Sequence, residues 1–183
     1  AVCPQGIGIN LNEERDKCIA CGKCAEVCPT NARSVLVHEV DADEVLEAIQ
    51  KHRLFYAMSG GGITFSGGEA TGQPKFLNYL TEHIYDLGYS MTIETSGFFE
   101  FEDVRESLER MDLIFMDLKH IDSATHQKYT GIPNEKILEN MKRLQHLPGE
   151  VVIRIPVIGG VNNDEDNIRR SAAFVHANIP KAR

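Results

Sequence analysis

Four apolar segments alternate with four amphipathic segments between residues 63 and 178, and this order constrains the fold more than any other feature. The apolar segments lie at 63–68, 90–97, 111–120 and 151–158, and the amphipathic ones at 73–88, 101–110, 134–147 and 162–178. Short apolar segments bounded by turn residues predict strands, and apolar residues at three- and four-residue spacing predict helices. Strands that alternate with helices form right-handed β-α-β units and a parallel sheet. An open doubly wound sheet and a barrel both fit this pattern, which alone does not choose between them.

Helix boundary signals support this order. A further helix is predicted over residues 42–57, because a capping-box pattern precedes an apolar stripe there. Pro74 lies in the first turn of the next helix and Gly88 at its end, as is typical of proline and glycine. Asn163 or Asp164 is the expected N-cap of the last helix.

Composition describes an ordinary globular chain and excludes some partners. The 183 residues are 42% hydrophobic and 25% charged, with a net charge of −8. This acidic balance argues against a nucleic-acid or anionic membrane surface. No segment approaches the roughly 18 apolar residues of a membrane span, and no signal peptide is recognisable. We expect a cytoplasmic protein, because five cysteines clustered within the first 28 residues indicate a metal site in a reducing compartment.

Four of these cysteines form one uninterrupted motif. Cys18, Cys21, Cys24 and Cys28 give C-x2-C-x2-C-x3-C, and a proline follows. Thiolates at this spacing can surround a 4Fe–4S cluster, and Gly22 permits the tight turn between the second and third ligands. A zinc knuckle is the alternative, but its ligands usually come as two separated pairs. The motif therefore favours iron and sulfur.

The fifth cysteine, Cys3, gains a role from this motif. In two-cluster ferredoxins the fourth cysteine of such a run ligates the other cluster, so Cys28 is expected to serve a second cluster. The cluster begun by Cys18, Cys21 and Cys24 then needs a fourth ligand, which we predict to be Cys3. The sequence around Cys3, "CPQG", matches the tail of a similar upstream run whose first three cysteines are absent.

Polar and charged residues gather at the carboxyl ends of the predicted strands. In β/α architectures these ends meet on one face, where ligands bind. Gly67 and Gly68 let the backbone approach a ligand closely, and Glu69 can accept hydrogen bonds from a cationic amine. The later strands end with Glu94, Thr95, Ser96, Asp117, Lys119 and Arg154.

The charged residues among them need partners, since an isolated buried charge is costly. Asp117 and Lys119 are two residues apart on a strand and so point to the same side. Arg154, inside an apolar segment, requires an anion. A polar ligand and a purely structural salt bridge both explain these charges. The seven histidines are scattered singly, and only His120, directly after Lys119, is a candidate for the site.

Several motifs occurring together resemble the activating enzymes of glycyl radical enzymes, a radical S-adenosylmethionine group. "GGITFSGGEATGQPKFL", "TIETSGF", "LIFMDLKHIDSATHQKYTG", "NEKILENMKRL" and "IRIPVIGGVNND" all match this family in its order. Larger family members carry a two-cluster ferredoxin-like insert, which residues 1–33 resemble. The resemblance therefore implies a truncated 4Fe–4S segment over 1–33 and a radical S-adenosylmethionine domain, incomplete at its C-terminus, over 34–183.

The resemblance implies a fold, cofactors and a reaction. The family fold is a partial parallel (β/α)6 barrel, of which strands two to five are expected here. Gly67, Gly68 and Glu69 would hold the amino group of S-adenosylmethionine. Thr95, Ser96, the segment Asp117-Leu118-Lys119 and Arg154 would line the cofactor site or the neighbouring substrate channel. In the family, a reduced 4Fe–4S cluster cleaves S-adenosylmethionine, and the resulting radical takes a hydrogen atom from a glycine of the partner glycyl radical enzyme. A flavodoxin or ferredoxin is the expected reductant.

The sequence also departs from the family. "SGGEP" is "SGGEA" here, "IPG" is "IGG", and the C-x3-C-x2-C motif of the radical cluster does not occur. We therefore expect an internal fragment that is inactive by itself. Two alternatives stay open: another radical S-adenosylmethionine enzyme with auxiliary clusters, and a non-enzymatic ferredoxin-type electron carrier. The sequence does not name the partner enzyme.

Overall fold

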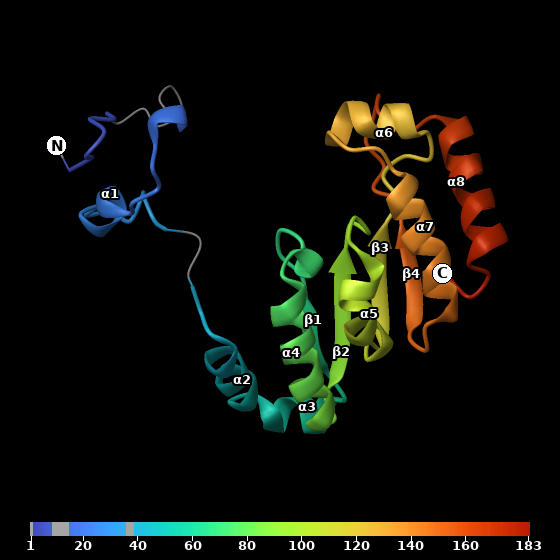
Figure 1. Ribbon diagram of the computed structural model, residues 1–183, viewed down its shortest axis with the longest axis horizontal. Helices are drawn as coiled ribbons and strands as arrows, with labels where there is room; N and C mark the ends of the chain where they lie inside the picture. Colours follow the sequence, from blue (N-terminus) through green and yellow to red (C-terminus); the bar gives the residue numbers. More distant parts are fainter. Residues whose placement is uncertain (1, 9–14, 36–38) are drawn as a thin grey trace. The chain divides into compact units, whose positions relative to one another are not determined.

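A computed structural model describes residues 2–8, 15–35 and 39–183 (Figure 1). The chain forms two compact units, Ala1–Asp41 and Ala42–Arg183. The predicted boundary between residues 33 and 34 stays a prediction. Within the described residues, no helix has both the length and the apolar character needed to cross a membrane.

The first unit contains little regular structure among its described residues. It has a 3-10 turn, η1 (Arg15–Lys17), and one short helix, α1 (Lys23–Glu26). The predicted turn between the second and third cysteines of the motif is present. Gly22 caps α1 at a φ of 75°, a left-handed conformation that costs glycine nothing sterically.

The second unit contains the four predicted strands. They are β1 (Gly62–Phe65), β2 (Ser90–Thr95), β3 (Leu113–Asp117) and β4 (Glu150–Arg154). All neighbouring pairs are parallel, and the spatial order is β1-β2-β3-β4. A doubly wound sheet reverses its order at a switch point, whereas this sheet runs in one direction. With right-handed crossovers, a sheet of this order has its connecting helices on one face, which is the arrangement of a barrel.

The helices of the second unit include those predicted after each strand. They are α2 (Ala42–Gln50), α3 (Arg53–Ser59), α4 (Pro74–Asp86), α5 (Phe101–Glu109), α6 (Ser123–Thr130), α7 (Glu135–Arg143) and α8 (Glu165–Asn178), with short 3-10 turns η2 (Ala70–Gly72) and η3 (Leu144–His146). Pro74 begins α4, and Asp164 caps α8 by accepting from the Asn167 backbone N–H at 2.9 Å. Both boundaries were predicted.

Alternation along the strands places the core between the sheet and its helices. Met91, Ile93, Ile114 and Met116 are fully buried, whereas the residues between them are half-buried. The buried set packs with Leu77, Leu80, Ile84, Val104, Leu108, Ile137 and Met141 from α4, α5 and α7. At the outer edge of β4, the Arg183 backbone N–H donates to Val151 and its carbonyl accepts from Ile153, both at 3.0 Å.

Two helix predictions differ from the structure. The helix predicted over 42–57 is interrupted after Gln50, and α3 starts at Arg53. A continuous helix would place His52 and Arg53, three and four residues after the buried Ile49, on the core face. The interruption brings Tyr56 against Tyr89 instead, with ring centroids 5.2 Å apart.

Helix α6 was not predicted. It lacks an apolar stripe, and its one buried residue is His126. Its ends carry the signals of a short helix: Asp122 accepts from the Thr125 backbone N–H at 2.9 Å, and Gly131 has a φ of 87°. Figure 1 shows α6 beyond the carboxyl ends of β3 and β4, where it borders the polar face described next.

Candidate functional site

The carboxyl ends of the four strands form one polar pocket of about 230 Å³. The sequence-predicted residues that line it are Gly67, Gly68, Glu69, Thr95, Ser96, Asp117, Lys119 and Arg154, joined by Ser66 and Glu94. Leu118 does not line it. Its side chain is buried in the core, and its backbone N–H donates to the Arg154 carbonyl at 2.9 Å. The parallel sheet therefore brings together residues that are up to 88 positions apart, from Ser66 to Arg154.

Glu69 ties the loop after β1 to the end of β2. Its Oε1 accepts from Thr71 N at 3.2 Å, Thr71 Oγ1 at 2.8 Å and Thr95 Oγ1 at 2.7 Å. Its Oε2 accepts from Ser96 N at 2.9 Å and Ser96 Oγ at 2.6 Å. All five donors are neutral. Oε2 has fewer donors than Oε1, so it is the oxygen with more capacity for a further donor from a ligand.

These contacts keep Glu69 ionised. Burial is the largest single influence on the Glu69 pKa and raises it, because a half-buried carboxylate loses hydration. The hydrogen bonds from the Ser96 side chain and backbone, Thr95 and Thr71 outweigh burial, so the pKa lies below its ordinary value. The pocket therefore holds a negative charge with which no cationic side chain of the described residues forms an ion pair.

Arg154 forms ion pairs with the other two carboxylates. Its Nε lies 2.9 Å from Asp117 Oδ1, and its Nη1 lies 3.2 Å from Glu94 Oε2. Burial lowers the Arg154 pKa, but the contacts with Asp117 and Glu94 outweigh it and raise the pKa. The Arg154 guanidinium also lies 5.3 Å from the centre of the Phe115 ring. The ion pair that the sequence left open as a structural alternative is therefore present, with Glu94 as an additional partner.

Lys119 is the second cation of the pocket, beside Arg154. It is exposed, and its side chain has no hydrogen bond or ion pair within the part of the chain that the structure describes. Arg154 faces Glu94 and Asp117, so one carboxylate, Glu69, and one ammonium group, Lys119, remain for a ligand. A ligand that carries both an ammonium and a carboxylate group complements this pair.

Buried asparagines fix the loops that form the pocket. Asn140 donates to the carbonyls of Gly97 and Phe99, at 2.9 and 2.8 Å, after β2. Asn162 donates to the Lys119 and Pro156 carbonyls, at 2.7 and 2.8 Å, and so links the loops after β3 and β4. Sequence reasoning missed these residues and Thr71. Their types are common in loops, and only the fold shows which carbonyls they reach.

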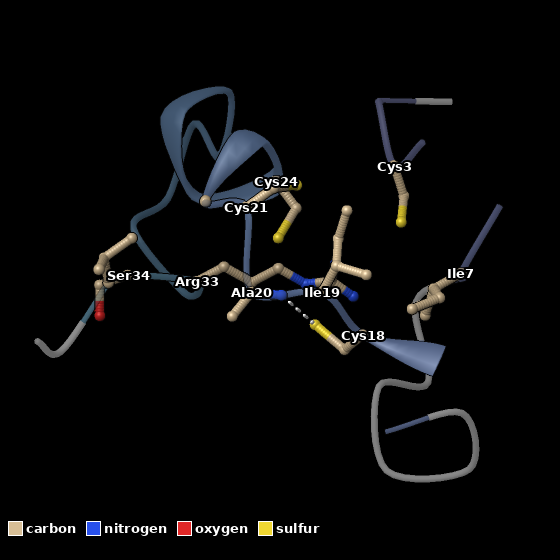
Figure 2. A pocket seen from close by; sticks show the side chains of 11 residues that line it. Cys3, Ile7, Cys18, Ile19, Ala20, Cys21, Cys24, Arg33 and Ser34 are labelled. Atoms are coloured by element: carbon tan, nitrogen blue, oxygen red, sulfur yellow. Dashed lines mark hydrogen bonds between the residues drawn. The ribbon is translucent and has the colours of Figure 1, made fainter. Parts of the chain in front are cut away.

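The cysteines of the first unit form a second candidate site. Cys3, Cys18, Cys21 and Cys24 line one pocket of about 430 Å³, together with Ile7, Ile19, Ala20, Gly22, Arg33, Ser34 and Val35. Figure 2 shows the four cysteine side chains arranged around this pocket. Four soft thiols in largely apolar surroundings are a donor set that fits a 4Fe–4S cluster. Among the residues described, no three Cys, His, Asp or Glu side chains form a group that could hold a metal ion, so shared ligation stays a prediction.

Cys28 lies outside the lining of that pocket. Its thiol is 3.8 Å from Thr30 Oγ1. Backbone hydrogen bonding from Arg33, followed by the Thr30 side chain, lowers the pKa of the Cys28 thiol, because both stabilise the thiolate.

Comparison with known proteins identifies the family. A model of the radical SAM superfamily matches residues 23–172. The isethionate sulfite-lyase activating enzyme of Nitratidesulfovibrio vulgaris is 37% identical over 167 residues, which cover 90% of this chain and 54% of that protein. The choline trimethylamine-lyase activating enzyme of Oleidesulfovibrio alaskensis is 39% identical over 175 residues, covering 92% and 56%. A crystal structure of a domain of pyruvate-formate lyase-activating enzyme from Bacteroides vulgatus has a TM-score of 0.60 at 38% identity, covering 67% of this chain and 75% of that one.

The chain belongs to the radical SAM superfamily. Within it, the similar curated proteins place the chain among the activating enzymes of glycyl radical enzymes. The predicted family and partial-barrel fold are thereby confirmed. Membership implies a 4Fe–4S cluster and S-adenosylmethionine as cofactors. The chain spans about half the length of the curated relatives it matches.

Proposed function

We propose that the protein containing this chain activates a glycyl radical enzyme by reductive cleavage of S-adenosylmethionine. The observation that carries the proposal is a pair of charged groups in the strand-end pocket, the Glu69 carboxylate and the Lys119 ammonium group. Neither forms an ion pair with another side chain among the described residues. S-adenosylmethionine ends in an α-amino acid, which has one ammonium and one carboxylate group. Glu69, beside Gly67 and Gly68, would accept from the ammonium group, and Lys119 would face the carboxylate.

The chemistry comes from the cofactors. When bound, the cluster and S-adenosylmethionine would supply one-electron reductive cleavage and, through it, removal of a hydrogen atom from a glycine Cα of the partner. The chain's own residues orient the reactants. Thr71, Thr95 and Ser96 hold the Glu69 carboxylate in place. Arg154, fixed by Glu94 and Asp117, closes the side of the pocket next to β4.

The cysteine pocket is proposed to hold an auxiliary 4Fe–4S cluster. Cys3, Cys18, Cys21 and Cys24 would be its ligands, and Cys28 would serve a second cluster. Such clusters would relay electrons from a reducing flavodoxin or ferredoxin in the cytoplasm. The C-x3-C-x2-C motif of the radical cluster does not occur in the 183 residues. We propose that those ligands belong to another part of the protein.

Glycyl-radical formation tests the proposal directly. The full-length protein is reconstituted anaerobically with iron and sulfide, reduced, and mixed with S-adenosylmethionine and a candidate partner enzyme. Isethionate sulfite-lyase and choline trimethylamine-lyase, named with the relatives above, are the first candidates. Electron paramagnetic resonance should show a glycyl radical on one partner and none when its glycine is replaced by alanine.

Two other results would point elsewhere. Cleavage of S-adenosylmethionine without a radical on any glycyl radical enzyme would indicate a different radical S-adenosylmethionine enzyme. Reversible reduction of the clusters with no binding of S-adenosylmethionine would indicate an electron carrier. In that case Glu69→Gln would leave the reduction of the clusters unchanged.

A further inference from the structure

The main chain leaves the sheet directly after β3. The Leu118 N–H, which donates to the Arg154 carbonyl at 2.9 Å, extends the pairing of β3 with β4 by one residue beyond Asp117. Lys119 follows outside the strand, so its main chain needs other partners to stay in one position. The place where this segment is held sets the region that the Lys119 ammonium group can reach.

The side chain of Asn162 holds the main chain of Lys119. Asn162 Nδ2 donates to the Lys119 carbonyl at 2.7 Å and to the Pro156 carbonyl at 2.8 Å, and its Oδ1 accepts from the Ile158 N–H at 2.7 Å. The residue is only 2% exposed. These partners fix the orientation of the amide, because only its NH2 group can donate to two carbonyls. Asn162 therefore joins the end of β3 rigidly to the loop after β4.

Two further buried asparagines, each 1% exposed, extend this network. Asn167 on α8 donates from Nδ2 to the Asn162 carbonyl at 2.9 Å and accepts at Oδ1 from the Ile121 N–H at 3.0 Å. Asn134, which precedes α7, donates to the His120 and Ile121 carbonyls at 2.8 and 3.0 Å. The three asparagines thus bind the carbonyls of three consecutive residues, 119–121.

The network supports one end of the strand-end pocket. Glu69, at the other end, is held by hydroxyl and main-chain donors from the loop after β1 and the end of β2. Asn162 is not among the residues that line this pocket. A change at Asn162 should therefore affect the position of Lys119 and leave the contacts of Glu69 in place.

We propose that Asn162, braced by Asn167, is a positioning residue for the carboxylate end of the ligand. It acts through Lys119, whose main chain it holds, and does not touch the ligand itself. The proposal rests on the proposed function and adds a residue that determines specificity. With Asn162 in place, the pocket distinguishes an amino acid from an amine that lacks the carboxylate group.

Titration of the full-length, reconstituted protein with two ligands tests the assignment. S-adenosylmethionine carries an ammonium and a carboxylate group, whereas decarboxylated S-adenosylmethionine keeps only the ammonium group at that end. Lys119→Met should raise the Kd for S-adenosylmethionine about tenfold, and Asn162→Ala about fivefold, because a contact between charged groups is lost or weakened. Neither variant should change the Kd for the decarboxylated ligand. In the double variant, Asn162→Ala should add nothing to the effect of Lys119→Met.

Asn140→Ala is the matched control. Asn140 is 4% exposed and also donates to two loop carbonyls, but these belong to Gly97 and Phe99 after β2. Its replacement should change the Kd for both ligands by the same factor, which measures the general cost of loosening a loop. Circular dichroism shows whether each variant folds. If Asn162→Ala does not fold, Asn167→Ala removes only the brace and should raise the Kd for S-adenosylmethionine alone, about twofold or more.

The outcomes separate the assignment from the proposed function. An equal loss of affinity for both ligands in Asn162→Ala, or in Asn167→Ala where that variant replaces it, would overturn the assignment. Independent, additive effects of Asn162→Ala and Lys119→Met would overturn it as well. Both results would leave the proposed function intact, since wild type would still bind S-adenosylmethionine. A wild-type protein that binds neither ligand would contradict the proposed function, and the assignment would fail with it.

Discussion

Replacement of Gly97 by alanine should destabilise the second unit more than a matched replacement elsewhere. Gly97 follows Ser96 in the loop after β2 and has a φ of 84°. A Cβ at this position would lie 2.1 Å from Met116 Cε and 3.1 Å from Ile137 Cγ2. Met116 is fully buried, so its terminal methyl group cannot move into solvent. The variant therefore combines backbone strain with overpacking.

The two contributions can be separated. A left-handed conformation costs a residue with a Cβ about 1–2 kcal/mol, and overpacking a filled core costs about 1–3 kcal/mol. Gly97→Ala should therefore lower the free energy of unfolding by about 2–5 kcal/mol. Gly88→Ala is the control, since Gly88 has a φ of 73° and no atom lies within 4 Å of its added Cβ. It should cost only the strain, about 1–2 kcal/mol.

Urea unfolding followed by circular dichroism measures both variants. A double-mutant cycle with Met116→Val provides the decisive comparison, because removing the Met116 methyl group should reduce the cost of Gly97→Ala to nearly that of Gly88→Ala. Equal costs for Gly97→Ala and Gly88→Ala in the wild-type background would refute the packing argument. Displacement of the backbone at residue 97 should also weaken binding of S-adenosylmethionine. The Gly97 N–H donates to Thr95 Oγ1 at 3.1 Å, and Thr95 Oγ1 in turn donates to Glu69.

Three further predictions concern the two candidate sites. Glu69→Gln should weaken binding of S-adenosylmethionine at least tenfold by titration calorimetry. Because the folded Glu69 pKa is lowered, the carboxylate's contribution to stability is present above its ordinary pKa of 4.5 and is lost as pH falls through the folded pKa. The stability difference between wild type and Glu69→Gln should shrink over that acidic range, and a constant difference would contradict it. Arg154→Met leaves Glu94 without its cation and should lower the affinity for S-adenosylmethionine. Arg154→Lys should recover part of that affinity. Equal affinity of wild type and both variants would show that the charge of Arg154 does not contribute to binding. Cys3→Ser should remove the cluster of the cysteine pocket, and Cys28→Ser should retain it, as judged by iron content and electron paramagnetic resonance; the opposite pattern would exclude Cys3 as its ligand.

The barrel-type sheet shows where sequence patterns suffice. Each strand and the helix that follows it are local features, so apolar periodicity and capping residues predicted them. Parallel pairing followed from their alternation. The local pattern did not predict the sequential order of the strands, because open and closed sheets share that pattern; the family resemblance implied it and the structure shows it. Helix α6 escaped prediction because it is stabilised by its caps rather than by an apolar face.

The polar pocket shows the same division at the level of side chains. Gly67, Glu69, Asp117 and Lys119 could be named from their positions at strand ends, because parallel strands bring these ends together. The partners of Arg154 could not be assigned, since Glu94 is 60 positions away and strand register decides which carboxylates it meets.

The sequence by itself therefore determined the cysteine motif, the β/α alternation and the chemical types of the residues at the strand ends, because these depend on neighbours along the chain. Only the tertiary structure decided that neutral donors surround Glu69, that Arg154 is shared by two carboxylates, and that Lys119 is left for a ligand. Those outcomes depend on distances between residues on different strands, which chain folding sets and local pattern does not.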